Sequence, residues 1–130
     1  MTIDLFILDD EPSICAVLTG MAGHARFSSV SFQSGVQALA YLKTCSELPR
    51  AYFVDMRIPG SEEELRSSKD IFDYLSSRNQ TERFNFMTGH ISEHDLLVQQ
   101  QTHAPILQKP LQVFEEITRL FSELRALKDI

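Results

Sequence analysis

Residues 3–12 read IDLFILDDEP, and this stretch decides the fold. Ile3 to Leu8 form an almost continuous apolar run, as expected of a strand that is buried on both faces of a parallel sheet. Adjacent carboxylates end the run, and Pro12 suits the first position of a helix. The stretch therefore predicts a buried strand and a helix joined by an acidic turn.

The rest of the chain repeats this alternation of short apolar runs and amphipathic segments. Further strands are predicted over residues 27–32, 51–54, 84–87 and 105–108. Three helices are predicted from apolar spacing, over residues 12–22, 70–77 and 113–127. Two more are predicted from capping boxes, one that begins after Ser34 (with Gln37) and one that begins after Ser92 (with Asp95). Residues 59–66 are predicted to be a polar, acidic loop. This (βα)5 alternation predicts a doubly wound α/β fold with a parallel five-stranded sheet and right-handed crossovers.

Size and charge restrict the class of protein. The 130 residues fit one domain, and the net charge of −6 without a basic cluster disfavours direct binding of nucleic acid. No apolar run is long enough to span a bilayer. The sequence does not open with a basic region followed by an apolar stretch, so we expect no secretory signal. The two cysteines, Cys15 and Cys45, lie in predicted helices without metal-ligand neighbours, so we expect reduced thiols.

In open sheets of this type, ligands bind at the carboxyl ends of the strands. The first strand ends in Asp9-Asp10-Glu11, where repulsion between carboxylates is relieved by solvent or by a cation such as Mg²⁺, which prefers oxygen ligands. A charged start of the following helix explains the same residues equally well.

Three other strands also end in polar residues. Asp55 follows a buried strand, and if that strand neighbours the first, about 4.8 Å away, Asp55 faces the acidic pair across a gap that one metal ion can fill. A carboxylate there can attack phosphorus and form an aspartyl phosphate. Thr88 could donate a hydrogen bond to a phosphoryl oxygen, and Lys109 could pair with a carboxylate or a phosphate.

Together these residues resemble the receiver domain of bacterial two-component response regulators. The matching motifs lie at or just after strand ends: Asp9-Asp10, Asp55-Met56, Pro59-Gly60, Thr88-Gly89 and Lys109-Pro110. The resemblance extends from Ile3 to the last helix. It implies the flavodoxin-like strand order 2-1-3-4-5 and one receiver domain over residues 1–130, of the single-domain kind found in chemotaxis regulators.

The resemblance also implies roles for individual residues. Asp55 would be the phospho-acceptor and a Mg²⁺ ligand. Asp10 would bind Mg²⁺ directly, Asp9 directly or through water, and Arg57 through its backbone carbonyl.

The phosphoryl group would have two further partners at the ends of later strands. Thr88 would move towards it and Lys109 would pair with it. A cis peptide bond is implied before Pro110.

The implied function is a phosphorylation-dependent switch in a phosphorelay, located in the cytoplasm. A histidine kinase or a phosphotransfer protein would donate the phosphoryl group. A downstream protein would bind the face of the fourth helix, fifth strand and fifth helix, with no membrane insertion. The chain would catalyse its own phosphotransfer and slow dephosphorylation, with no turnover of a separate substrate.

Four features of the sequence depart from the family pattern or stand apart from it. Ile106 replaces the usual aromatic residue three places before the lysine, and Arg57 could pair with the acidic pocket or shield the phosphoryl group. The acidic segment 62–64 could affect partner choice or simply be solvated. His90 could respond to pH near the site, although an ordinary loop residue is the simpler interpretation.

Two other functions compete with the switch. The first is a receiver-like interaction module that works without phosphate, for which Ile106 and the acidic segment leave room. The second is a Mg²⁺-dependent phosphohydrolase with Asp55 as nucleophile. Such enzymes need a separate general acid near the nucleophile and usually a cap over the substrate. This function is disfavoured because the sequence has neither a DxD at the first strand nor room for a cap.

Overall fold

The structure is a computed structural model that describes residues 2–56 and 62–128, with side chains for residues 2–56 and 68–127. Its strands are β1 Leu5–Leu8, β2 Ser29–Phe32, β3 Ala51–Asp55, β4 Phe84–Thr88 and β5 Ile106–Gln108. Its helices are α1 Pro12–His24, α2 Gly35–Thr44, α3 Glu62–Ser76, α4 Glu93–Thr102 and α5 Leu111–Lys128.

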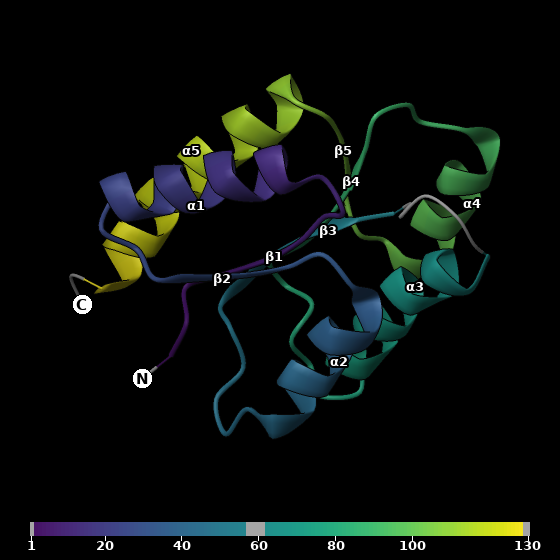
Figure 1. Cartoon of the computed structure of the whole chain (residues 1–130), viewed down its shortest axis with the longest axis horizontal. Helices are drawn as coiled ribbons and strands as arrows, with labels where there is room; N and C mark the ends of the chain where they lie inside the picture. The colour runs from purple at the N-terminus through teal and green to yellow at the C-terminus, as the bar shows by residue number, and fades with distance from the viewer. Residues whose placement is uncertain (1, 57–61, 129–130) are drawn as a thin grey trace.

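The strands form one five-stranded parallel sheet in the order β2-β1-β3-β4-β5. Helices α1 and α5 cover one face, and α2, α3 and α4 lie on the other (Figure 1). The α/β class, the (βα)5 alternation and the flavodoxin-like strand order predicted from the sequence are therefore confirmed.

Each face of the sheet carries its own apolar core. Phe6, Tyr52 and Phe84 pack with Ile71 and Leu75 towards α2 and α3. The second core lies between the sheet and the helices α1 and α5. The strands contribute Leu5, Ile7, Phe53 and Met87, and the last helix contributes its apolar stripe of Val113, Ile117, Leu120, Phe121 and Leu124. Burial on both faces is what the continuous apolar run of β1 predicted.

Most predicted helix starts hold, with one exception. The Ser92–Asp95 capping box forms in both directions, whereas at α2 the Ser34 side chain accepts from the Gln37 N–H without a reciprocal bond among the described residues. The predicted loop over residues 59–66 is wrong from residue 62 onward, because α3 already begins at Glu62. Glutamates favour the positive end of a helix, and Glu, Leu and Arg have high helix propensity, so this polar segment is helical without an apolar stripe.

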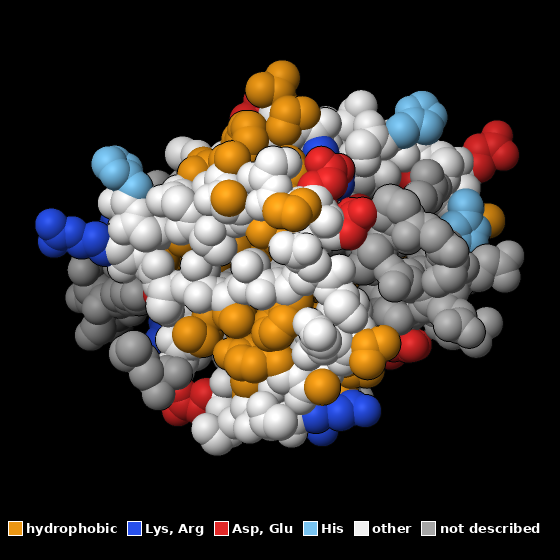
Figure 2. Space-filling view, in the orientation of Figure 1, with side chains coloured by type: hydrophobic (Ala, Val, Ile, Leu, Met, Phe, Trp, Pro, Cys, Tyr) orange, Lys and Arg blue, Asp and Glu red, His pale blue; other side chains and the backbone are white. Residues whose placement is uncertain are grey.

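Figure 2 shows a band of backbone and uncharged, non-hydrophobic side chains along the sheet edge, with apolar side chains gathered over the layer of α1 and α5 and again on the side of α2. The large exposed apolar residues include Val17 of α1, Leu111 of α5 and Val36 of α2. Within the described ranges, the helices are too short or too polar to cross a membrane.

Candidate functional site

Asp9 and Asp55 occupy equivalent places at the carboxyl edge of the sheet. Leu8 of β1 lies opposite Val54 of β3, so the residues that follow them emerge side by side. Carboxylate oxygens of Asp9, Asp10 and Asp55 all lie within 4.8 Å of one another. These are three of the residues that the sequence predicted for Mg²⁺, and an all-oxygen carboxylate set is the donor chemistry that this cation prefers.

The Asp9 carboxylate is fully buried, and both of its oxygens are engaged. Oδ1 accepts a hydrogen bond of 2.9 Å from the Glu11 N–H, and Oδ2 lies 3.1 Å from the Lys109 ammonium. Burial raises the pKa of Asp9, and the Glu11 N–H and the Lys109 ammonium only partly offset this effect. A bound cation would favour the ionised form of this carboxyl group.

Asp55 ends β3 and is 2% exposed. The Ser68 hydroxyl of α3 donates a 2.7 Å hydrogen bond to its backbone carbonyl, and the Lys109 ammonium lies 3.6 Å from its Oδ2. The first of these contacts fixes the main chain at the end of β3. The second places a positive charge beside the carboxylate.

Within the described part of the chain, Lys109 supplies the positive charge of the site, and it follows β5 directly. Its backbone N–H donates a 2.8 Å hydrogen bond to the Thr88 carbonyl, which extends the β4–β5 pairing beyond the strand end. The peptide bond to Pro110 is cis, as the family resemblance implied. Burial disfavours the charged ammonium, but the surrounding carboxylates of Asp55, Asp9 and Glu11 outweigh burial and raise the pKa of Lys109. The side chain is therefore an ammonium ion at neutral pH.

Thr88 ends β4, and its hydroxyl is turned back to its own loop. Oγ1 donates a 3.0 Å hydrogen bond to the His90 carbonyl and lies 3.4 Å from the His90 N–H. The side chain is nearly buried, and a Cβ added at Gly89 would meet no neighbour within 4 Å. To donate to a phosphoryl group, the hydroxyl would have to release the His90 carbonyl.

The structure adds Glu11 to the predicted residues. Its Oε1 lies 3.3 Å from the Lys109 ammonium, which therefore contacts three carboxylates. The sequence pattern included Glu11 in the acidic turn but gave it no role of its own, because its partner lies 98 residues away along the chain. A carboxylate directly after the acidic pair was the only signal.

Other predicted residues lie outside the site or beyond the described residues. Arg57, whose carbonyl was predicted to bind Mg²⁺, and the Pro59-Gly60 pair fall outside the described residues, as do the side chains of the acidic segment 62–64. His90 is exposed and contacts Thr88 only through its backbone. Ile106 is 9% exposed and belongs to the core on the α2–α4 side.

The two thiols are not joined by a disulfide. Cys15 is buried in α1 directly below the acidic turn, and its Sγ lies 3.3 Å from the Asp9 carbonyl. Burial, together with the charge of Asp9, raises the pKa of Cys15, so the thiol stays protonated as a hydrogen-bond donor.

Comparison with solved structures identifies the architecture. No protein-family model matches the chain, and no curated protein matches it in sequence. A receiver domain of a LuxO repressor protein from Vibrio parahaemolyticus superposes with a TM-score of 0.71 at 15% identity, over 99% of this chain and 96% of that one. A CheY-like receiver domain protein from Methanospirillum hungatei gives 0.73 at 15% identity, over 97% and 98%.

A third structure is similar over nearly its whole length. It is the BeF3-activated conformation of SdrG from Pseudomonas melonis, with a TM-score of 0.66 at 24% identity, covering 93% of this chain and 99% of that one. The resemblance noted in the sequence is thus confirmed at the level of the fold. The fold of this protein is that of a response regulator receiver domain.

Proposed function

We propose that the chain is a phosphorylation-dependent switch of a two-component phosphorelay, a single receiver domain that accepts a phosphoryl group on Asp55. The observation that carries this proposal is the meeting of Asp9, Asp10 and Asp55 within 4.8 Å beside the Lys109 ammonium. A structural role alone does not require three carboxylates and a lysine at one edge of the sheet, because burying charge is costly.

In the proposed reaction, a carboxylate oxygen of Asp55 attacks the phosphorus of a phosphohistidine on the donor protein. A P–O bond forms, the P–N bond breaks, and the leaving imidazole nitrogen takes up a proton. Asp9, Asp10 and Asp55 would hold Mg²⁺, which supplies neutralisation of the charge on the phosphoryl oxygens. The Arg57 carbonyl stays the predicted fourth protein ligand.

The residues of the chain then stabilise the product. The Lys109 ammonium, already 3.6 Å from Asp55 Oδ2, would pair with the phosphoryl group, and the Thr88 hydroxyl would leave the His90 carbonyl to donate to it. Release of His90 would change the loop between β4 and α4. The face of α4, β5 and α5 is the proposed readout surface for a downstream protein.

The test is the intact mass of the chain after incubation with a small-molecule phosphodonor, with and without Mg²⁺, beside an Asp55→Asn variant. The expected result is a gain of one phosphoryl group that needs both Mg²⁺ and Asp55. An unchanged mass in the presence of bound Mg²⁺ would favour an interaction module that works without phosphate. The aliphatic Ile106 in the core, where the family usually carries an aromatic switch residue, is the observation that keeps this second function under test.

A further inference from the structure

Glu11 makes a contact that the predicted metal cluster does not explain. The Lys109 ammonium lies 3.1 Å from Asp9 Oδ2, 3.3 Å from Glu11 Oε1 and 3.6 Å from Asp55 Oδ2. Asp9 and Asp55 belong to the group of carboxylates close enough to share a metal ion, and Glu11 does not. The ammonium therefore divides its hydrogen bonds and charge between two candidate metal ligands and one other carboxylate.

The position of Glu11 in the helix supports a specific use of its side chain. Glu11 is the N-cap residue of α1, and its side chain makes no capping hydrogen bond to that helix. N-cap side chains usually accept from the backbone N–H groups of the first turn. Here the Glu11 carboxylate points to Lys109 instead.

The carboxylates of Asp9 and Asp55 contact the Lys109 ammonium and are also the groups that would hold a divalent cation. With a cation held there, the two positive charges would repel each other, and the ammonium would be driven away from Asp9. An ammonium ion that is only 11% exposed cannot turn to solvent freely, so it needs another carboxylate when it gives up Asp9. Glu11, with a side chain that is 56% exposed, offers that carboxylate outside the metal cluster.

We infer that Glu11 is a positioning residue that keeps the Lys109 ammonium paired, so that a divalent cation can occupy Asp9. The inference deepens the proposed function and rests on its Mg²⁺ site. Without Glu11, both remaining partners of Lys109 among the described residues are candidate metal ligands, and the cation would have to break a buried ion pair for which these residues offer no replacement. Mg²⁺ should then bind more weakly.

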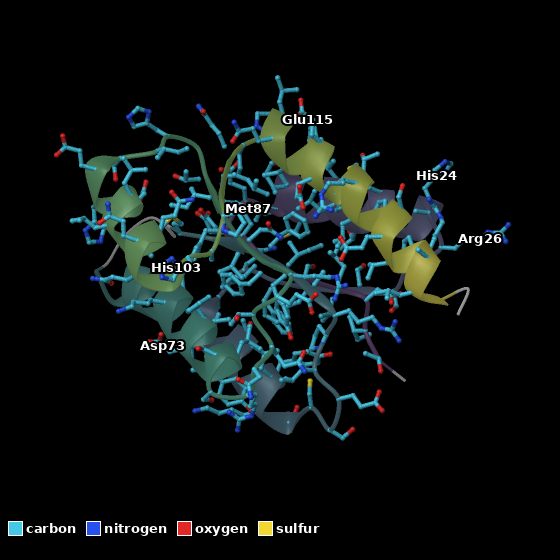
Figure 3. The ribbon with its side chains drawn as sticks, turned by 180° about the vertical axis from the view of Figure 1, so that it is seen from behind. His24, Arg26, Asp73, Met87, His103 and Glu115 are labelled. Carbon is cyan, nitrogen blue, oxygen red and sulfur yellow. The ribbon has the colours of Figure 1, made fainter. Side chains whose placement is uncertain are left out.

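The test is a double-mutant cycle read by calorimetric titration of the whole chain with Mg²⁺ alone, without a phosphodonor. Glu11→Gln should weaken Mg²⁺ binding by about three- to fivefold, the range expected of a partly exposed ion pair. In a Lys109→Met background the same substitution should change the affinity less than twofold, because the ammonium that Glu11 holds is absent. Glu115→Gln, on the first turns of α5 (Figure 3), is the matched loss of one exposed carboxylate and should have no effect beyond twofold.

An equal weakening in both backgrounds would mean that Glu11 acts on the cation through its charge alone, and would overturn the inference. So would a Glu11→Gln affinity equal to that of Glu115→Gln. In both cases the proposed function still stands as long as the wild type binds Mg²⁺. If the wild type binds no Mg²⁺, the proposed metal site is wrong and the inference fails with it. Circular dichroism of each variant confirms that it is folded.

Discussion

The Lys109 ammonium lies closer to Asp9 than to Asp55, with 3.1 Å to Asp9 Oδ2 and 3.6 Å to Asp55 Oδ2. The lysine therefore donates a hydrogen bond to Asp9, whereas its contact with the predicted phospho-acceptor Asp55 is a longer ion pair. Since Asp9 is also the most completely buried of the three clustered carboxylates, the ammonium is the charge that partly compensates its burial. Binding of a cation to this cluster would therefore be linked to release of the lysine.

The stability of the fold should depend on the ionisation of Asp9. Burial raises the pKa of folded Asp9 above the unfolded value near 3.8, so the folded chain binds this proton more tightly than the unfolded chain. Tighter binding of this proton by the folded chain stabilises the fold, and the effect is fully present below the pKa that Asp9 has in the unfolded chain. The effect is lost as the pH rises through the higher pKa of folded Asp9, and the ionised carboxylate then destabilises the fold. We expect Asp9→Asn, which cannot ionise, to be more stable than the wild type at neutral pH and equally stable at about pH 3.

Urea unfolding followed by circular dichroism at several pH values without divalent cations checks this expectation. Asp73→Asn on the outer side of α3 (Figure 3) is the control, because it removes an exposed carboxylate away from the site. A stability gain of Asp9→Asn that is the same at every pH would show that loss of ionisation at Asp9 is not its cause.

Magnesium should make the wild type more stable than the Asp9→Asn variant. A cation that binds only the folded state adds RT ln(1 + [L]/Kd), or about 2.7 kcal/mol at one hundred times the dissociation constant. Thermal unfolding of the wild type should therefore shift upward with Mg²⁺ and return after chelation. Asp9→Asn should shift much less, and a shift equal to that of the wild type would exclude Asp9 as a ligand.

Thr88→Val should loosen the loop that follows β4. The substitution keeps the shape of the buried side chain and removes the hydroxyl that binds the His90 carbonyl and N–H. We expect a loss of about 1 kcal/mol in the free energy of unfolding, the usual worth of such a hydrogen bond. The backbone N–H of His90 should also exchange faster with deuterium, measured by NMR. Thr88→Ser keeps the hydroxyl and should preserve the exchange rate of the wild type.

The sheet and most of the site could be predicted because they follow from local patterns. Apolar runs such as residues 3–8 mark buried strands, and the strand-end rule then places Asp9 and Asp55 at one edge. The stripe of α5 is visible from helical spacing alone. The start of α3 was missed because residues 62–66 lack an apolar face, and there helix propensity and charge decide the structure.

Contacts between distant residues could not be predicted in the same way. The sequence indicated that Lys109 pairs with a carboxylate or a phosphate, but its division between Asp9 and Glu11 joins residues 100 and 98 positions apart. The directions of the side chains at the end of β5 and the start of α1 determine how Lys109 contacts Asp9 and Glu11. No periodic pattern in the sequence predicts these directions.

Ile106 should behave as a core residue. It is 9% exposed and packs in the cluster that includes Phe86, Val98 and Ala104. Ile106→Ala should therefore reduce the free energy of unfolding by about 2–3 kcal/mol, whereas Ile106→Val should cost about 1 kcal/mol, both measured by urea unfolding. A loss below about 0.5 kcal/mol for the alanine variant would indicate that this position is loosely packed and available for a conformational switch.

Tyr52→Phe should stabilise the chain. Tyr52 is 1% exposed, its ring packs against Phe6 and Phe84, and its hydroxyl has no hydrogen-bond partner among the described residues. Burial is also the main reason why the pKa of Tyr52 is raised. A buried hydroxyl without a partner costs about 1–3 kcal/mol, so its removal should add about 1 kcal/mol to the free energy of unfolding while the ring contacts persist.

Urea unfolding near neutral pH measures this gain, and Tyr74→Phe is the matched control. The Tyr74 hydroxyl donates a 3.4 Å hydrogen bond to the Leu42 carbonyl, so its loss should be neutral or destabilising. Above about pH 10 the advantage of Tyr52→Phe should grow, because ionisation of the tyrosine is then possible in the unfolded chain and opposed in the folded one. A destabilised Tyr52→Phe chain would instead mean that the hydroxyl has a partner in solution, such as an ordered water molecule that bridges it to a neighbouring polar group.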